Sequence, residues 1–198
     1  MSTGNPASAR QKPKGDKRER TRAALLEAAR ALIRETGYER TTLEKVAARA
    51  GMTTGAIYGN FKNRDELFIA LGEAYWPPIK PKVPPDATFA AAMHAFATAT
   101  IAAVDERRPA AMGRLTGLAY ALKNAELRSR VVEVTKSSYE FGAEWLTRFD
   151  SRQLPMPPQL LVRVLHSLIE GLVMQRLLTP ELCPDEVFYA AFAALAKR

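Results

Sequence analysis

The chain has 198 residues, 47% of them hydrophobic, which is enough to bury the core of one large domain or of a small domain joined to a larger one. Its formal net charge of +8 is compatible with an anionic partner such as nucleic acid, acidic lipid or acidic protein, although many proteins are mildly basic without one. The single cysteine, Cys183, excludes an intrachain disulfide, and we expect a cytoplasmic protein because no apolar signal sequence is apparent.

Most of the positive charge lies in the first third of the chain. Residues 1–66 contain 14 Lys and Arg against 8 Asp and Glu, whereas residues 67–198 contain 15 against 13. Residues 1–17 are rich in Ser, Gly, Pro and Lys, which predicts a disordered basic arm. Such an arm is either a solvated tail or a flexible segment that contacts phosphates. The asymmetry favours a basic N-terminal module on a nearly neutral body.

Hydrophobic periodicity predicts four helices in the N-terminal third. In chain order they span about 18–36, 41–51, 53–60 and 63–76. Gly37 and Gly51 stand where the first and second helices stop. The segment from Pro77 to Pro85 contains five prolines, and we expect it to connect the module to the body.

Two capping boxes mark helix starts within this region. Thr41 is the expected N-cap of the second helix, with Glu44 at the third helical position. Asn63 and Glu66 form a second box that opens the fourth helix.

The body is also expected to be helical throughout. No run alternates apolar and polar residues as a strand does, and no hairpin turn signal is present. The expected helices span about 89–104, 109–123, 125–149, 159–178 and 185–197, with Asn124 and Asp185 as N-caps. The uncharged stretch 87–104 is too weakly apolar to span a membrane, and a buried bundle helix explains it better. The prediction is therefore an all-α protein of about nine helices.

A short helix, a glycine-containing turn and a second short helix form the helix-turn-helix pattern of DNA-binding proteins. Thr53 and Thr54 offer hydroxyls at the start of the second of these helices, where free backbone N–H groups favour an anion. Gly55 and Ala56 let the backbone approach base edges. Ile57 and Phe61 are expected to face inward, against Val46 and Leu43. The alternative is a generic turn in an all-α protein.

The segment TTLEKVAARAGMTTGAIYGNFKNRDEL resembles the DNA-binding signature of the TetR family of bacterial transcriptional regulators, over roughly Arg18 to Leu71. The resemblance implies an all-α homodimer with a helix-turn-helix domain at residues 18–62 and a ligand-binding and dimerisation domain at residues 63–198. It implies binding to a palindromic double-stranded DNA operator and release by a small-molecule inducer, with no cofactor.

The resemblance also implies roles for single residues. Thr42 and Tyr58 contact phosphates, and Lys62 and Arg64 hold the DNA backbone nearby. Thr54, Gly55 and Ala56 lie at the bases. The DNA-binding residues expected are Thr42, Thr53, Thr54, Gly55, Ala56, Tyr58, Asn60, Lys62 and Arg64.

Two positions depart from the family pattern, because Gly59 and Asn60 stand where a His or another large residue is common. Gly59 weakens a helix by up to about 1 kcal/mol relative to Ala. Asn60 either reads an adenine or holds a phosphate.

The helix at 159–178 is apolar around almost its whole circumference, which predicts packing on both sides. We expect it to form a homodimer together with the helix near 185–197, with Gly171 allowing close approach of the partner helix. A central helix of a monomer is the alternative.

For the ligand site, apolar and aromatic residues of the body suggest a largely apolar or aromatic ligand. More of the apolar candidates are expected to be core residues than ligand contacts, and each polar candidate is equally compatible with a core position. Glu170 instead suggests selection of a cation. The expected ligand-binding residues are Phe89, Met93, His94, Phe96, Met112, Tyr120, Phe141, Trp145, His166 and Glu170.

Catalytic chemistry has little support in the sequence. It contains no HExxH, GxSxG or P-loop motif and no Cys-His metal spacing, so we expect neither catalytic nor metal-ligating residues. The remaining alternative to DNA binding is a basic module that binds a partner protein or an acidic membrane.

Overall fold

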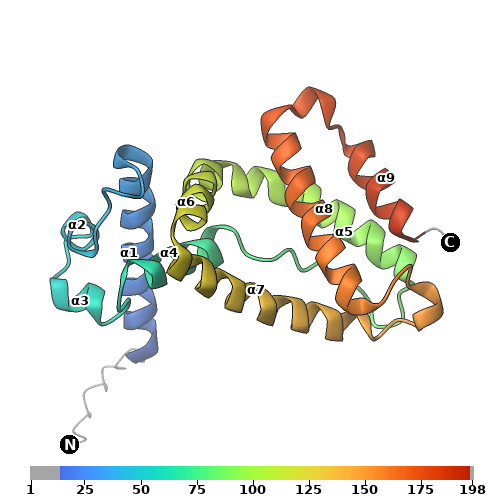
Figure 1. The fold of residues 1–198 in the computed structure, drawn as a ribbon, viewed down its shortest axis with the longest axis horizontal. Coiled ribbons are helices and arrows are strands. Elements are labelled where there is room, and N and C mark those ends of the chain that lie inside the picture. Colours follow the sequence, from blue (N-terminus) through green and yellow to red (C-terminus); the bar gives the residue numbers. More distant parts are fainter. Residues whose placement is uncertain (1–13, 197–198) are drawn as a thin grey trace, which may run out of the picture. The chain divides into compact units, whose positions relative to one another are not determined.

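The computed structural model describes residues 14–196 (Figure 1). These residues form nine α-helices and three short 3-10 helices and contain no strand, so the predicted all-α fold is confirmed. The α-helices are α1 (Lys14–Thr36), α2 (Leu43–Arg49), α3 (Thr54–Tyr58), α4 (Arg64–Tyr75), α5 (Phe89–Arg107), α6 (Ala111–Lys123), α7 (Ala125–Leu146), α8 (Pro158–Leu178) and α9 (Asp185–Ala196). The 3-10 helices are η1 (Arg108–Ala110), η2 (Ser151–Gln153) and η3 (Pro180–Leu182).

The chain divides into two compact units, and the division falls inside α4, between Leu71 and Gly72. The sequence had suggested a domain boundary after residue 62. The proline-rich segment 77–85, expected as the connection between module and body, lies in the second unit, where it runs from α4 to α5 (Figure 1).

Helix α1 begins earlier than the sequence predicts. Residues 1–13 of the expected basic arm lie outside the described residues, but residues 14–17 are helical rather than disordered. The hydroxyl of Thr21 donates to the Lys17 carbonyl at 2.9 Å.

The core of the first unit is formed by the apolar faces of its helices. Helix α2 packs against α1 and α3. As predicted, Ile57 and Phe61 are buried, and so are Val46 and Leu43. Gly37 ends α1 with a φ of 80°. The hydrophobic side chains buried in this unit are Leu25, Leu26, Ala28, Ala29, Ile33, Tyr38, Leu43, Val46, Ala47, Ile57, Phe61, Leu67, Ala70 and Leu71.

The predicted N-cap of α2 is wrong by one residue. Thr42, not Thr41, is the N-cap, and its hydroxyl oxygen accepts from the Lys45 N–H at 3.3 Å. Thr41 is buried and donates its hydroxyl to the Gly37 carbonyl at 2.9 Å. With Thr42 as the cap, Glu44 stands at the second helical position and cannot complete a capping box.

The second capping signal is confirmed at its N-cap. Asn63 Oδ1 accepts from the Glu66 N–H at 2.9 Å, and Glu66 Oε2 accepts from the Lys62 N–H at 2.8 Å. The Glu66 side chain therefore reaches one residue further back than in a standard capping box.

In the second unit, α5 is the central helix, and α8 and α9 pack against it, while α7 packs against α8 and α6 (Figure 1). The side chains of Ala92, Met93 and Ala97 on α5 and of Phe188 and Phe192 on α9 are completely buried. Small alanine side chains on α5 leave room for the phenylalanines of α9. Asn124 caps α7 as expected, accepting from the Leu127 N–H at 2.9 Å.

Helices α7 and α8 are in close contact at Gly142. A Cβ atom added to Gly142 would lie 2.5 Å from Val162 Cγ2. Because a β-branched side chain in a helix has one strongly preferred rotamer, Val162 cannot move aside cheaply. Gly142→Ala is therefore expected to lower the free energy of unfolding by about 1–3 kcal/mol.

Chemical denaturation followed by circular dichroism measures this effect. The matched control is Gly113→Ala on α6, where an added Cβ meets nothing within 4 Å. The control should be neutral or stabilising by about 0.5–1 kcal/mol. Equal stability of the two variants would contradict the close α7–α8 contact.

Candidate nucleic-acid interface and ligand pocket

The segment between α2 and α3 is a tight turn that fixes the direction of α3. Gly51 has a φ of 64°, a conformation that residues with a side chain rarely adopt. The Met52 N–H donates to the Ala47 carbonyl at 2.9 Å. Thr53 then caps α3, its hydroxyl oxygen accepting from the Ala56 N–H at 3.2 Å. This is the helix-turn-helix arrangement that the sequence predicts.

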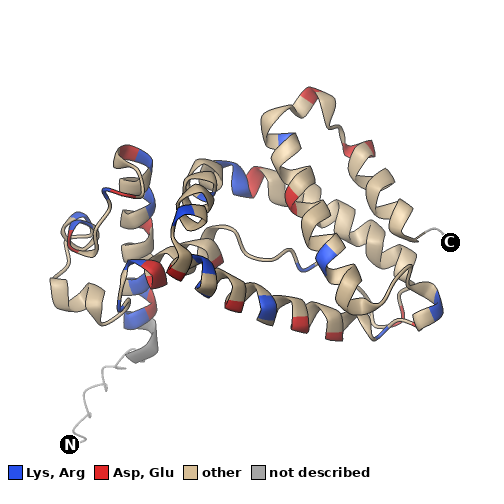
Figure 2. Ribbon diagram, viewed as in Figure 1, with Lys and Arg blue, Asp and Glu red and all other residues tan. Residues whose placement is uncertain are grey.

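The outward side of α2 and α3 carries most of the expected DNA contacts. Ala56 is half-buried beside them. The exposed candidates are Thr42, Thr53, Thr54, Gly55, Tyr58 and Lys62. Helix α3 has no charged side chain, whereas α1 carries several of both signs (Figure 2). The start of α3 therefore presents hydroxyls and open backbone, which suit a close approach to base edges.

Tyr58 is exposed but not free. It is 47% exposed, and its hydroxyl donates to Glu44 Oε1 of α2 at 2.6 Å. This hydrogen bond is the main cause that lowers the pKa of Glu44 and raises the pKa of Tyr58. A phosphate that takes the Tyr58 hydroxyl must replace the Glu44 carboxylate and overcome its repulsion.

Two other candidates turn towards the protein. Asn60 donates its side-chain N–H to the Ala56 carbonyl at 2.8 Å, and its Oδ1 is buried without a hydrogen-bond partner. Arg64 donates to the Glu39 carbonyl at 3.2 Å, and its guanidinium lies 5.1 Å from the centroid of the Tyr38 ring. In this conformation Arg64 holds the start of α4 against the segment that joins α1 to α2.

The sequence analysis missed two side chains that support the interface. One is Glu44 in its contact with Tyr58. The other is Arg22 of α1, which donates to the Asn60 carbonyl at 3.4 Å and lies 4.6 Å from the centroid of the Phe61 ring. Neither contact follows from local spacing, because each depends on how two helices cross.

The two helices expected to form the dimer present apolar residues outward. Helix α8 buries Leu161, Leu165, Leu172 and Val173 within its own unit. On the same helix Leu160 and Leu178 are exposed, Leu178 by 68%. Gly171 is exposed too, and a Cβ added there would meet nothing within 4 Å. Past its first turn, α9 carries no charge within the described residues (Figure 2).

The ten residues expected to bind a ligand do not gather in one place. Phe89 and Met93 are fully buried core residues. Phe96 and Trp145 pack edge-to-face at a centroid distance of 5.8 Å. Met112 is exposed on α6.

The other members of this set lie on several helices. His94 packs on Tyr189, with ring centroids 4.9 Å apart, and Tyr120 accepts from Asn124 Nδ2 at 3.3 Å. Phe141 is exposed, with Lys80 Nζ 5.2 Å from its ring centroid.

The two remaining polar candidates, His166 and Glu170, lie one turn apart on α8. His166 packs edge-to-face on Tyr139, with ring centroids 5.4 Å apart. Its pKa is lowered, first by desolvation and then by the positive charges of Arg114 and Arg107, while Glu170 opposes the shift. Glu170 accepts from Trp76 Nε1 at 2.9 Å.

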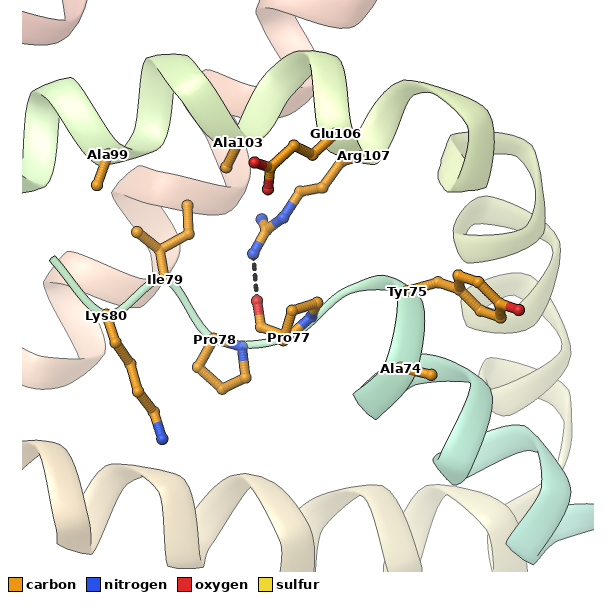
Figure 3. Close-up of a pocket in the computed structure, with 10 residues that line it drawn as sticks. All are labelled: Ala74, Tyr75, Pro77, Pro78, Ile79, Lys80, Ala99, Ala103, Glu106 and Arg107. Carbon is orange, nitrogen blue, oxygen red and sulfur yellow. Dashed lines mark hydrogen bonds between the residues drawn. The ribbon is translucent and has the colours of Figure 1, made fainter. Parts of the chain in front are cut away.

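A pocket of about 360 Å³ lies between α5 and the segment that follows α4 (Figure 3). None of the ten expected residues lines it. Its walls are mostly small or apolar, with three charged residues. The lining residues are Ala74, Tyr75, Pro77, Pro78, Ile79, Lys80, Ala99, Ala103, Glu106 and Arg107.

Family models match both parts of the chain. Residues 25–71 match the bacterial regulatory proteins of the tetR family, and residues 84–198 match the tetracyclin repressor-like C-terminal domain. The second match alone covers more than half of the chain. The chain belongs to the TetR family. It is thus a transcriptional regulator with an N-terminal DNA-binding helix-turn-helix domain and a C-terminal helical domain.

Curated relatives match over a short part of the chain. The HTH-type transcriptional regulator TtgR of Pseudomonas putida is 49% identical over 51 residues, which are 26% of this chain and 24% of that protein. The HTH-type transcriptional repressor AcnR of Corynebacterium glutamicum is 39% identical over 57 residues, 29% of this chain and 30% of that protein. The chain therefore matches only about a quarter to a third of the length of these curated relatives.

Solved structures match over nearly the whole chain. NalD of Pseudomonas aeruginosa, described as the secondary repressor of the MexAB-OprM multidrug efflux pump, is 25% identical over 89% of this chain and 94% of its own, with a TM-score of 0.59. A putative TetR-family regulator from Rhodococcus sp. is 18% identical over 90% of this chain and all of its own, with a TM-score of 0.68, and shows the fold alone.

Within residues 14–196 no helix is long and apolar enough to span a membrane. In the same range no three His, Cys, Asp or Glu side chains gather as a metal site would require.

The Tyr58–Glu44 hydrogen bond generates a prediction about DNA affinity. Tyr58→Phe should weaken operator binding about tenfold, because a charge-assisted hydrogen bond to phosphate is lost. Glu44→Gln should strengthen binding about twofold to fivefold, because an exposed carboxylate near the phosphates is removed. Fluorescence anisotropy with the operator duplex measures both, with thermal melts to verify that each variant folds.

The double variant serves as the control. If Glu44 acts by holding the Tyr58 hydroxyl, the gain from Glu44→Gln should shrink when Phe replaces Tyr58. A gain of the same size in both backgrounds would mean that Glu44 only repels the DNA.

Proposed function

We propose that this protein is a homodimeric repressor that binds a palindromic operator through α3 of each subunit and leaves it when a small molecule binds the helical body. The observation that carries the proposal is the exposed start of α3, with Thr54 and Gly55 next to the glycine turn that fixes its direction. Repression is supported by relatives such as AcnR and NalD, which are described as repressors.

The DNA contacts proposed are those on the exposed side of the helix-turn-helix. Thr42, Tyr58 and Lys62 bind phosphates, while Thr53, Thr54, Gly55 and Ala56 lie at the bases. Asn60 and Arg64 join them only after leaving the protein partners they have here. The protein would act in the cytoplasm, where the chromosome lies.

Two copies of the chain are needed for tight and specific binding. A single helix-turn-helix buries little surface on DNA, whereas a twofold dimer reads half-sites about 34–36 Å apart. The exposed apolar residues of α8 and the uncharged length of α9 support a dimer formed by these helices, which are expected to make a four-helix contact across the twofold axis.

The decisive experiment is fluorescence-anisotropy titration of the DNA that flanks the coding region, beside a shuffled duplex, at two salt concentrations. A specific regulator should discriminate by about a thousandfold or more. Lys62→Ala should weaken binding to both duplexes and reduce the slope of log K against log salt by about one unit. Equal, salt-sensitive binding to both duplexes would leave only a basic surface and contradict sequence-specific regulation by this DNA.

The dimer is tested by Gly171→Arg. The protomer should tolerate this change, because nothing lies within 4 Å of the position of a Cβ at Gly171. The large charged side chain should instead separate the two subunits. The protein then can no longer bind both half-sites of the operator at once. Sedimentation velocity should show a monomer, with operator affinity reduced by about two orders of magnitude or more.

The matched control is Val132→Arg, an exposed apolar residue of α7 outside the proposed interface. It should remain dimeric. A dimeric Gly171→Arg protein would place the interface elsewhere.

A further inference from the structure

Beside the pocket of the helical body lies a cluster of two arginines that share one carboxylate. Arg107 Nη1 of α5 lies 3.6 Å from Glu170 Oε1, and Arg114 Nη2 of α6 lies 3.5 Å from Glu170 Oε2. Trp76 Nε1 donates to the same carboxylate, and both guanidinium groups lie near the Trp76 ring, 4.7 and 5.7 Å from its centroid. A carboxylate neutralises one arginine, so the cluster keeps one excess positive charge.

Two donors of this cluster are buried without a hydrogen-bond partner. They are Arg107 Nη1 and Arg114 Nε. Arg107 is only 4% exposed, and its one short hydrogen bond runs from Nη2 to the Pro77 carbonyl at 2.5 Å. Buried guanidinium N–H groups without an acceptor are costly, which is why native proteins rarely keep them.

The charge on Arg107 is correspondingly disfavoured. Burial is the main cause that lowers the pKa of Arg107, and repulsion from Arg114 adds to it, while Glu170 and Glu106 oppose the shift. An additional anion at this position would favour the charged form of Arg107 and so oppose both causes.

Arg107 belongs to the cluster and also to the wall of the pocket. Figure 3 shows its side chain extending from α5 towards the segment after α4 and bonded to Pro77 there. The rest of that wall includes Ala99 and Ala103 of α5 and Ile79. The pocket volume of about 360 Å³ is in the range of small-molecule sites. Arg107 forms part of the wall of this largely apolar space, and Arg114 lies in the adjoining cluster. The space therefore fits a molecule with an apolar body and an anionic head.

The balance of charge limits that molecule to one negative charge. Lys80, Arg107 and Arg114 face Glu106 and Glu170 in the pocket and its cluster, so the net formal charge is +1. Glu106 is exposed and lines the pocket, where it would repel a second anionic group. Glu170 does not favour the cation suggested by the sequence, because its two oxygens are already shared among Trp76, Arg107 and Arg114.

We propose that this pocket binds an organic monocarboxylate, with its carboxylate at Arg107, where Arg114 of the adjoining cluster adds positive charge, and its apolar body against Ala99, Ala103 and Ile79. The proposal deepens the function proposed above and rests on it in one respect, that the ligand of this site releases the operator. Bound there, the ligand also touches Ala74 and Tyr75 in the last turn of α4, a helix that begins in the DNA-binding unit.

The test compares acids with their neutral analogues. Octanoate and 3-phenylpropanoate are titrated beside octanamide and 3-phenylpropanamide, with sodium chloride as the salt control. In Trp145→Phe protein, Trp76 is the only tryptophan, so its fluorescence reports on the cluster itself. The acids should change Trp76 fluorescence and raise the melting temperature of the unaltered protein, and the amides should bind at least about tenfold more weakly, since they lack the charge.

Arg114→Gln is the main variant, because its side chain is 25% exposed and less essential to the core than that of Arg107. It should weaken acid binding about tenfold or more, since the excess positive charge of the cluster beside the ligand carboxylate is lost. Glu170→Gln should strengthen it, because the competing carboxylate is removed. The matched control is Arg108→Gln, which removes a neighbouring guanidinium that pairs with Asp105 outside the cluster and should leave binding unchanged.

Three results would overturn the proposal. They are equal binding of acids and amides, equal behaviour of Arg114→Gln and Arg108→Gln, and no response of Trp76 to either acid up to about 10 mM, a limit that corresponds to very weak binding. Operator binding is measured separately on ligand-free protein. Specific DNA binding without acid binding removes only this inference, whereas acid binding without operator binding leaves the site and removes the proposed repressor.

Discussion

Helix α3 depends on burial for its existence. It has five residues, and an isolated helix of that length is not stable in water. Two buried side chains stabilise it: Ile57 within the helix and Phe61 just beyond it, both completely buried or nearly so. The glycine turn and the Thr53 cap then leave α3 one direction relative to α2. These buried residues fix the position of every residue proposed to contact a base. A substitution at Ile57 would therefore change DNA binding by moving α3.

The same surface combines groups that attract DNA with one that repels it. Hydroxyls, open backbone and Lys62 suit phosphates and bases, but Glu44 stands among them and holds the Tyr58 hydroxyl. The free protein thus keeps Tyr58 in a defined position through a negatively charged neighbour. In the proposed complex, that charge would lower affinity for any duplex and leave discrimination to contacts at the start of α3.

The sequence was most informative where a signal is local. The helices, the glycine turn, the Thr53 and Asn124 caps and the inward Ile57 and Phe61 all follow from spacing and capping, and the family signature adds the helix-turn-helix. The prediction of Thr41 as the N-cap of α2 was wrong because the adjacent Thr42 suits that role equally well. Only the buried hydrogen bond from Thr41 to the Gly37 carbonyl distinguishes the two threonines. Residues 14–17 were predicted to be disordered because of the charge and glycine content of that segment, but they are part of α1.

The pocket was missed for a different reason. Aromatic and methionine residues were the expected lining, but in this fold Phe89, Met93, Phe96 and Trp145 are used to fill the core. The pocket is left where side chains are small or the backbone is proline-rich, so its residues carry no conspicuous signal. Glu170 was recognised as unusual on an apolar helix, yet its partners Trp76, Arg107 and Arg114 come from three other places in the chain.

Helix α5 separates the pocket from the core, because one of its faces packs in the core and another lines the pocket. On one face its alanines let Phe188 and Phe192 of α9 pack closely, while on another Ala99 and Ala103 leave the space next to the segment after α4 unfilled. Larger residues at 99 and 103 would occupy the pocket with their own side chains. Arg107 ends the same helix and closes that space with a charge that the protein compensates only in part. An apolar space that ends at an incompletely paired guanidinium selects by charge at one end and by shape along its length, which no single residue in the sequence reveals.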